Sequence, residues 1–364
     1  MTDNCPSCGK PATISDPTRY GRCEPCAIPT DEENGWHFSN ESREFDGVTV
    51  HRIIYENSME GGWAQGAWNI AGGGHILDEA VVYGNASVWD HAIVSGNARI
   101  SEDAQIAENA VVTEDARISG HARVFGRAVV TDNARVSGKA EVCGLARILD
   151  AAHVYANATV TDETTISHHA NISGDAVIRD RATVRGRAWV YSNATIADHA
   201  SIRGSAAISG FAHVSDHAIV SGQAEVYGHA VISGNATVHS NARVNGNAKL
   251  GHRCLVTDFA HVSGDAQIAE NARIHGQALI YGRCLIQDYV IVTDNARIAG
   301  DANVGGNSVI TDKAKIDGDA EVFDTSIGGE SVITGNTKVH GNSNGQGISD
   351  YIMPWYTKRG HPGI

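Results

Sequence analysis

Residues 80–103 read AVVYGN ASVWDH AIVSGN ARISED, a six-residue unit of the form Ala-x-Val/Ile-x-Gly/Asp-x. The unit recurs without an insertion from about residue 68 to residue 323, and every sixth residue from Ile70 to Val322 is aliphatic. The residue two places earlier is Ala in nearly every unit that starts at 80 to 320; the exceptions are Thr164, Cys254, Cys284, Val290 and Ser308. This repeat decides the fold of most of the chain.

A period of six fits neither an α-helix, whose faces recur every 3.6 residues, nor a long strand, whose faces alternate every two. It fits a short strand followed by a turn. Ala and the aliphatic residue then point inward, the residues flanking the aliphatic one point outward, and Gly, Asp or Asn turns the corner. Three units close a triangular coil of about 18 residues, and successive coils pair as parallel strands about 4.8 Å apart. The sequence predicts an all-β, single-stranded parallel β-helix of about 14 coils, a rod on the order of 70 Å long.

The repeat resembles that of the hexapeptide-repeat proteins, a superfamily of bacterial acyltransferases and nucleotidyltransferases. The resemblance covers residues 68–323 and implies a left-handed parallel β-helix. It also implies trimers whose subunits pack along their faces. For an enzyme of this kind it implies an acetyl-coenzyme A type donor and a histidine as general base, and His168 and His169 are the candidates.

Two departures from the family pattern favour a binding role over catalysis. The usual unit places Gly directly after the aliphatic residue, whereas here Gly or Asp comes one place later. Enzymes of the family commonly extrude a loop that carries the catalytic His or covers the donor, and this repeat has no interruption. We therefore expect a non-enzymatic scaffold or binding protein that engages partners through its lateral faces and its N-terminal head. A hexapeptide-repeat acyltransferase is the alternative.

Composition and charge restrict the function further. The 364 residues include only 6% aromatic residues, and all seven prolines lie outside the repeat, where their missing N–H groups interrupt no strand pairing. The net charge of −14 excludes a general nucleic-acid binder, which needs a positive surface. No apolar run is long enough to span a membrane, and the start Met-Thr-Asp-Asn-Cys does not read as a signal peptide. We expect a soluble protein in the cytoplasm, or in a particle assembled there.

The first 28 residues carry two Cys-x-x-Cys pairs with 14 residues between them; the cysteines are Cys5, Cys8, Cys23 and Cys26. Two such turns brought together by a hairpin supply the four sulfurs of a tetrahedral zinc site. The pattern resembles a zinc ribbon and predicts one structural Zn²⁺. Two disulfides or a redox pair are the alternatives. Cys254 and Cys284 replace the inward Ala and are expected to be core thiols.

The sequence divides into four parts: a zinc ribbon at 1–28, an N-terminal cap and linker at 29–67, the β-helix at 68–323, and a C-terminal coil and cap at 324–364. A cap is expected because the end of a β-helix exposes strand edges and an apolar cross-section. Residues 48–55 are expected to form a strand of this cap. After Val322 the repeat slips by one residue, and an aromatic segment at 352–356 is expected to cover the last coil.

Residues 18 apart are expected to stack on one face of the β-helix. One outward position carries a tyrosine on every second coil and reads Tyr155, Ser173, Tyr191, Ser209 and Tyr227. Trp189 lies beside Tyr191. A subunit interface, a glycan and a protein partner are the alternatives for this row.

Arginines gather in one stretch of the repeat: Arg179, Arg181, Arg185, Arg187 and Arg203. Arg203 is 18 residues after Arg185, so the two guanidinium groups are expected to stack on adjacent coils, and Arg187 is expected to stack on His169. Such like charges repel unless an anion lies between them. The sequence predicts an anion-binding site formed by Arg185, Arg187, Arg203, His169, Trp189 and Tyr191. The alternative is ion pairing with Asp180 and Asp198, or side chains spread into solvent.

Overall fold

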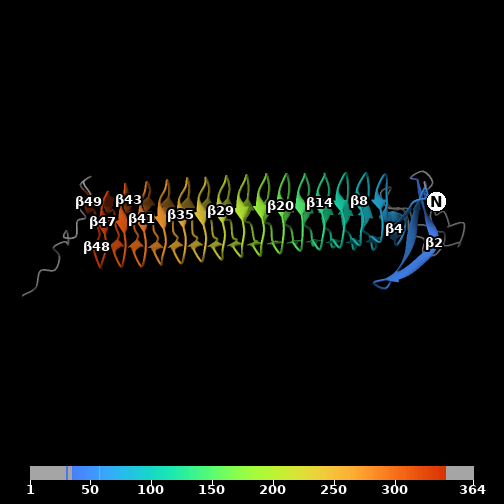
Figure 1. The fold of residues 1–364 in the computed structure, drawn as a ribbon, viewed down its shortest axis with the longest axis horizontal. Helices are drawn as coiled ribbons and strands as arrows, with labels where there is room; N and C mark the ends of the chain where they lie inside the picture. Colours follow the sequence, from blue (N-terminus) through green and yellow to red (C-terminus); the bar gives the residue numbers. More distant parts are fainter. Residues whose placement is uncertain (1–29, 32–34, 57, 342–364) are drawn as a thin grey trace, which may run out of the picture. The chain divides into compact units, whose positions relative to one another are not determined.

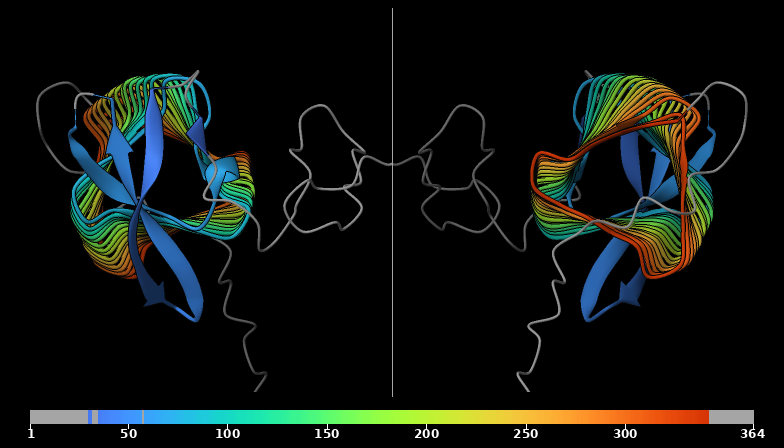
Figure 2. Two further views of the ribbon diagram at one scale, coloured as in Figure 1. Left: turned by 90° about the vertical axis from the view of Figure 1, so that its right-hand side faces the viewer. Right: turned by 90° about the vertical axis from the view of Figure 1, so that its left-hand side faces the viewer.

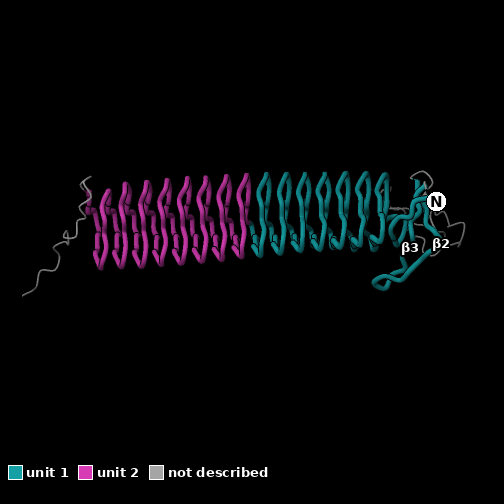
Figure 3. Tube along the Cα trace, in the orientation of Figure 1, with its two compact units in different colours: residues 1–193 teal, residues 194–364 magenta. Residues whose placement is uncertain are grey.

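The computed structural model describes residues 30–31, 35–56 and 58–341, which form β-strands and one short 3₁₀ helix (Figure 1). The chain divides into two compact units, Met1–Asn193 and Ala194–Ile364 (Figure 3). Within each unit, short strands recur about every six residues and pair in parallel with the strand three places further along the chain. Three strands and three turns outline each coil as a triangle (Figure 2). The predicted all-β parallel β-helix is confirmed.

Unit 1 begins with an antiparallel cap and continues into three parallel sheets. The cap contains β1 (Thr30–Asp31), β2 (Trp36–Phe45), β3 (Val48–Tyr55), β4 (Glu60–Ala64) and the 3₁₀ helix η1 (Ala67–Asn69). Sheet A contains β6 (Val81–Val82), β9 (Arg99–Ile100), β12 (Arg117–Ile118), β15 (Arg135–Val136), β18 (His153–Val154), β21 (Asn171–Ile172) and β24 (Trp189–Val190). Sheet B contains β7 (Ser87–Val88), β10 (Gln105–Ile106), β13 (Arg123–Val124), β16 (Glu141–Val142), β19 (Thr159–Val160) and β22 (Val177–Ile178). Sheet C contains β5 (His75–Ile76), β8 (Ile93–Val94), β11 (Val111–Val112), β14 (Val129–Val130), β17 (Arg147–Ile148), β20 (Thr165–Ile166) and β23 (Thr183–Val184).

Unit 2 consists of three further parallel sheets. Sheet D contains β27 (Ala207–Ile208), β30 (Glu225–Val226), β33 (Arg243–Val244), β36 (His261–Val262), β39 (Leu279–Ile280), β42 (Arg297–Ile298), β45 (Lys315–Ile316) and β48 (Val332–Ile333). Sheet E contains β25 (Thr195–Ile196), β28 (His213–Val214), β31 (Val231–Ile232), β34 (Lys249–Leu250), β37 (Gln267–Ile268), β40 (Leu285–Ile286), β43 (Asn303–Gly305), β46 (Glu321–Phe323) and β49 (Lys338–His340). Sheet F contains β26 (Ser201–Ile202), β29 (Ile219–Val220), β32 (Thr237–Val238), β35 (Leu255–Val256), β38 (Arg273–Ile274), β41 (Ile291–Val292), β44 (Val309–Ile310) and β47 (Ser326–Ile327).

The interior of each coil is the predicted one. The repeated Ala and the repeated aliphatic residue are buried, as at Ala128 and Val130. Cys254 and Cys284 are buried in the Ala position, and burial raises the pKa of each thiol to about 12. The prediction that both are core thiols is confirmed.

Each corner is made by the fifth residue of the hexad, which adopts a positive φ such as 60° at Asp132 and 70° at Gly144. The corners lie so close together that a Cβ on Gly144 would come within 2.6 Å of the backbone nitrogen of Asp162. Where Asp takes this position, its carboxylate accepts the backbone N–H of the corner one coil later. Asp132 Oδ2 accepts from Asp150 N at 3.0 Å, and Asp150 Oδ2 accepts from His168 N at 2.8 Å. Gly and Asp therefore turn most corners as predicted, while Glu, Ser, His and Ala156 adopt the same positive φ at other corners.

The cap satisfies the backbone groups that the first coil leaves open on all three sheets. On sheet A, β4 pairs with β6, and Trp63 N donates to Ala80 O at 2.8 Å. On sheet B, the buried side chain of Asn69 donates to Ala86 O at 2.7 Å. On sheet C, the Tyr55 hydroxyl accepts from Ile76 N at 2.8 Å and donates to Ile76 O at 3.2 Å. The strand expected at 48–55 is observed as β3.

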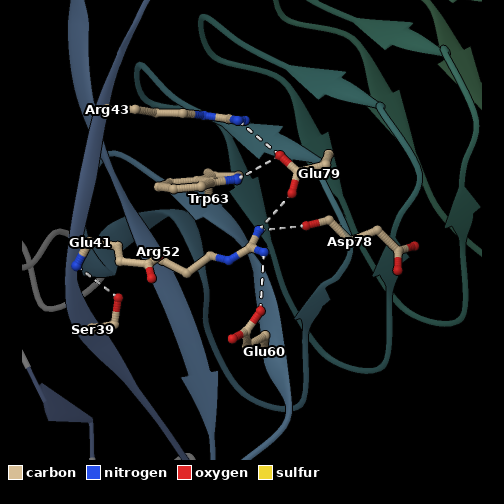
Figure 4. A network of polar contacts seen from close by, with 8 residues as sticks. All are labelled: Ser39, Glu41, Arg43, Arg52, Glu60, Trp63, Asp78 and Glu79. Carbon is tan, nitrogen blue, oxygen red and sulfur yellow. Dashed lines mark hydrogen bonds and ion pairs between the residues drawn. The ribbon is translucent and has the colours of Figure 1, made fainter.

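Two arginines clamp the cap onto the first coil. Figure 4 shows the guanidinium groups of Arg43 and Arg52 on either side of the Trp63 ring. The Cζ atoms of Arg43 and Arg52 lie 4.1 and 4.9 Å from the ring centroid. Glu79, on the first coil, accepts hydrogen bonds from Arg43 at 2.8 Å, Arg52 at 3.0 Å and the Trp63 indole at 3.2 Å. Trp63 of the cap is therefore fixed to the coil by both stacking and hydrogen bonding, and the two arginines by their charge.

The last coils show the predicted slip of one residue. Val309 pairs with Ser326 and Lys315 with Val332, a spacing one residue shorter than in the preceding coils. The aromatic segment expected to cover the last coil, at 352–356, lies outside the described residues.

Replacing Tyr55 by Phe should destabilise the cap by about 1–3 kcal/mol, because the Ile76 N–H and C=O lose their buried partner. Burial raises the pKa of Tyr55 to about 12, so the parent chain should lose the contribution of the neutral hydroxyl as the pH rises from about 10 to about 12. Chemical unfolding followed by tryptophan fluorescence at several pH values measures both effects. A Tyr55→Phe chain with unchanged stability at pH 7 would contradict this role.

Candidate functional site

Sheet A of unit 1 carries a row of cationic side chains. Arg99, Arg117 and Arg135 occupy the same outward position on β9, β12 and β15, and each arginine pairs in register with the next. His153 on β18 continues the row, paired with Arg135. We call these four residues the arginine stripe. Arg117 and Arg135 are exposed, while Arg99 and His153 are half-buried.

The arginines of the stripe form no ion pair with any carboxylate among the described residues. Arg99 lies 5.0 Å from the Phe45 ring. Some other arginines of unit 1 are paired with carboxylates. Arg123 pairs with Glu141 on the next coil at 2.9 Å, and Arg181 pairs with Glu163 at 2.9 Å. The stripe is therefore a local concentration of positive charge in a chain of net charge −14.

His153 is partly buried at the end of the stripe, next to Arg135. Its partial burial, and in second place the charge of Arg135, hold the pKa of His153 below its usual range. The His153 ring stacks on Tyr155 at a centroid distance of 4.5 Å, and its Nε2 lies 3.1 Å from the Ser137 hydroxyl. The ring is thus fixed beside the arginines with both an aromatic and a polar contact.

Trp189 and Tyr191, predicted as binding residues, lie on the same sheet as the stripe. Trp189 starts β24 and pairs with Asn171, which lies one coil beyond His153. Its side chain is 51% exposed, and its ring centroid lies 5.5 Å from that of Tyr191. Sheet A thus presents a run of arginines followed by exposed aromatic rings.

The other predicted anion-site residues lie in turns or directly after strands. Arg185 follows β23 of sheet C, whereas Arg187 and His169 belong to the turns that enter sheet A; His169 N donates to Gly186 O at 2.8 Å. Arg203 follows β26 in unit 2. Of the wider cluster, Arg179 pairs with Asp180 at 2.8 Å and Arg181 with Glu163, which matches the ion-pairing alternative for these two.

His168, a candidate general base, sits at a corner with φ 62° and is well exposed. Its Nδ1 lies 3.0 Å from the Ser167 hydroxyl and 3.5 Å from Asp150 Oδ2. A relay from nucleophile through base to carboxylate needs contacts at both ring nitrogens. Here both contacts share one nitrogen, so the three residues orient the ring without forming such a relay.

The four cysteines of the expected zinc ribbon, Cys5, Cys8, Cys23 and Cys26, lie outside the described residues. Within residues 35–56 and 58–341, no group of three or more His, Cys, Asp or Glu side chains is arranged to hold a metal ion. Cys143 is half-buried, and its thiol lies 3.3 Å from the Thr161 hydroxyl.

The sequence reasoning missed the arginine stripe because it looked for arginines close together in the chain. The available signal was the 18-residue spacing of Arg99, Arg117 and Arg135, the same rule that identified the tyrosine row. Position within the coil, rather than distance along the sequence, brings these charges together.

Comparison with known proteins supports the fold. Residues 116–132 match a family model described as YdcK Beta solenoid repeat. This segment contains β12, β13 and β14, one strand from each sheet of unit 1. No curated protein matches the chain. In the described part of the chain, no helix has the length and apolar character needed to cross a membrane.

Replacing Arg135 by Ser should raise the pKa of His153, because it removes the neighbouring positive charge that disfavours the imidazolium. An NMR titration of the His153 ring protons measures the change. Arg147→Ser is the matched control, since Arg147 is an exposed arginine on β17 of sheet C. An equal pKa in the parent and the Arg135→Ser chain would show that burial alone accounts for the value.

Proposed function

We propose that this protein is a β-solenoid scaffold that binds an acidic protein partner along sheet A of unit 1. The observation that carries the proposal is the arginine stripe, three arginines in register on adjacent coils with no ion pair to a described carboxylate. Parallel pairing fixes the separation of their backbones at about 4.8 Å. Two unit charges at that distance repel by about 1 kcal/mol in water, and by more where solvent is excluded.

A carboxylate placed between two such arginines converts this repulsion into paired hydrogen bonds. The guanidinium group is planar and binds a carboxylate through two parallel N–H···O contacts. Because the strands hold the arginines in a fixed row, the partner meets a preorganised set of donors, and less entropy is lost on binding. Acidic side chains along an extended segment or a strand would match the row.

The neighbouring residues favour a protein over a nucleic acid. Arginine, tyrosine and tryptophan are the residue types that contribute most to protein interfaces. Tyr155, Trp189 and Tyr191 lie on the same sheet as the stripe. The chain as a whole is acidic, which opposes the long phosphate contacts of a nucleic acid. Two copies meeting through sheet A would bring like charges together, so the trimer that the family resemblance implies would use other faces.

Changing Arg117 and Arg135 together to Ser should weaken binding of fluorescent poly-L-glutamate by about tenfold or more, since each lost charge-assisted contact accounts for a large share of the affinity. Affinity should also fall as salt rises. Fluorescence anisotropy at several salt concentrations measures both effects.

The matched control is the double change Arg147→Ser with Arg273→Ser. These arginines are exposed on sheets C and F, and removing them changes the net charge by the same amount. Equal losses in the two double variants would mean that poly-L-glutamate responds to net charge only, and the proposed role of the stripe would be wrong.

We also propose that residues 1–28 form a zinc ribbon and that this N-terminal segment makes a further contact with the partner. Elemental analysis should find one zinc per chain, and Cys5→Ser or Cys23→Ser should lower that content because a structural site needs four ligands. Cys143→Ser, which alters a thiol of sheet B, should leave zinc unchanged. Much less than one zinc in the parent chain would reject the site.

A further inference from the structure

We propose that sheet D of unit 2 carries a binding groove for an acidic oligosaccharide. A surface groove of about 770 Å³ runs between two rows of side chains on adjacent coils. One row lies in the turns before sheet D and contains Phe259, Gln277, Asn295 and Lys313; the other lies on its strands and contains Leu279, Arg297 and Lys315. The groove is separate from the arginine stripe, and its role does not depend on the partner proposed above.

The backbone leaves the turn side chains free to face the groove. Gln277 N donates to Asp294 O at 2.6 Å and Asn295 N donates to Asp312 O at 2.8 Å, so the peptide groups hold the coils together. The amide side chains of Gln277 and Asn295 are exposed one coil apart. An amide offers both donors and an acceptor, which suits the hydroxyl groups of a sugar.

The groove also has flat apolar surfaces. Phe259 is 64% exposed in the lining of the groove, and Leu279 is half-buried there. Tyr281, two residues after Leu279, is also exposed but lies outside the lining. An exposed ring of this kind can pack against the C–H face of a sugar ring, and ligand sites combine such apolar walls with a few polar groups.

The positive charge indicates an acidic ligand. Arg297 pairs in register with Lys315, and neither forms an ion pair with a carboxylate among the described residues. Lys313 is held at the edge by Glu330 at 3.3 Å. A carboxylate or sulfate on the sugar would lie between Arg297 and Lys315 and remove their repulsion.

Acidic residues at the edge of the groove offer acceptors for the hydroxyl groups of a sugar. Asp317 follows Lys315 on sheet D and is exposed, and Asp294 and Asp312 form the adjoining corners. These carboxylates can accept hydrogen bonds from sugar hydroxyls.

A second groove, three coils earlier in the chain, serves as an internal comparison for this one. The same two rows form a smaller groove of about 350 Å³, lined by Ser205, Ala207, Gln223, Glu225, Asn241 and Arg243. It repeats the Gln and Asn of the turn row, but serine replaces Phe259 and the arginine is already paired, since Arg243 Nε lies 3.1 Å from Glu225 Oε2. This groove has the amides without the free charge or the ring.

The test measures binding of the full chain to polygalacturonate, a polymer of uronic acids, by isothermal titration calorimetry. Arg297→Ser with Lys315→Ser should weaken binding about tenfold or more, because both cations lose their contacts with the carboxylates. Asn295→Ala should weaken binding to polygalacturonate while leaving binding to poly-L-glutamate unchanged, since the amide recognises hydroxyls. Uncharged dextran should bind far more weakly than polygalacturonate.

Two controls separate this site from other causes. Arg243→Ser should leave polygalacturonate binding unchanged. The comparisons are repeated in a chain that also carries Arg117→Ser and Arg135→Ser, so that the stripe contributes to the binding of neither polymer. Circular dichroism should show the fold intact in every variant, as expected for exposed side chains. In that background, parent-like binding by the Arg297/Lys315 variant would overturn the proposal, as would equal or tighter binding of single-stranded DNA or poly-L-glutamate.

Discussion

Each described coil depends on a residue in the left-handed backbone conformation at every corner. This conformation changes the chain direction from one sheet to the next and keeps the following strand in register with the coil before it. Glycine adopts it without a Cβ penalty, and aspartate adopts it while offering a carboxylate to the corner N–H of the next coil. A positive φ at the fifth position of the hexad is thus a backbone requirement, met mostly by Gly and Asp. It leaves the residues on either side of the aliphatic position free to vary.

That freedom creates the surface of the protein. Because the coils are in register, each outward side chain lies directly beside the residue one coil away, and that neighbour decides its chemistry. Arg123 next to Glu141 forms an ion pair, and so does Arg243 next to Glu225. Arg117 next to Arg135, and Arg297 next to Lys315, leave charge available for a partner or ligand. The same register therefore produces some surfaces where charges are paired and others where they are not.

Features of the fold and of the candidate site could be predicted from the sequence where they repeat along the chain. The strict hexad predicted the parallel coils, the buried Ala and aliphatic positions, the buried Cys254 and Cys284, and the slip after Val322. The contacts of the cap could not be predicted, because the Tyr55 hydroxyl reaches Ile76 from a segment with no repeat. Trp189 and Tyr191 lie on the sheet of the stripe. Arg99, Arg117 and Arg135 were not predicted, because their 18-residue spacing spreads them over a long stretch of the sequence.

The three-sided coil makes the fold and the surface respond differently to changes in chain length. Deleting one hexad within a unit would keep every aliphatic residue inside and every corner residue at a corner, so the core would be rebuilt almost unchanged. Every outward residue beyond the deletion would nevertheless move to the next face, and rows such as Arg99, Arg117 and Arg135 would be broken. Only insertions or deletions of whole coils preserve both. Selection on binding should therefore be visible as length changes in steps of three hexads, even where stability alone would tolerate one.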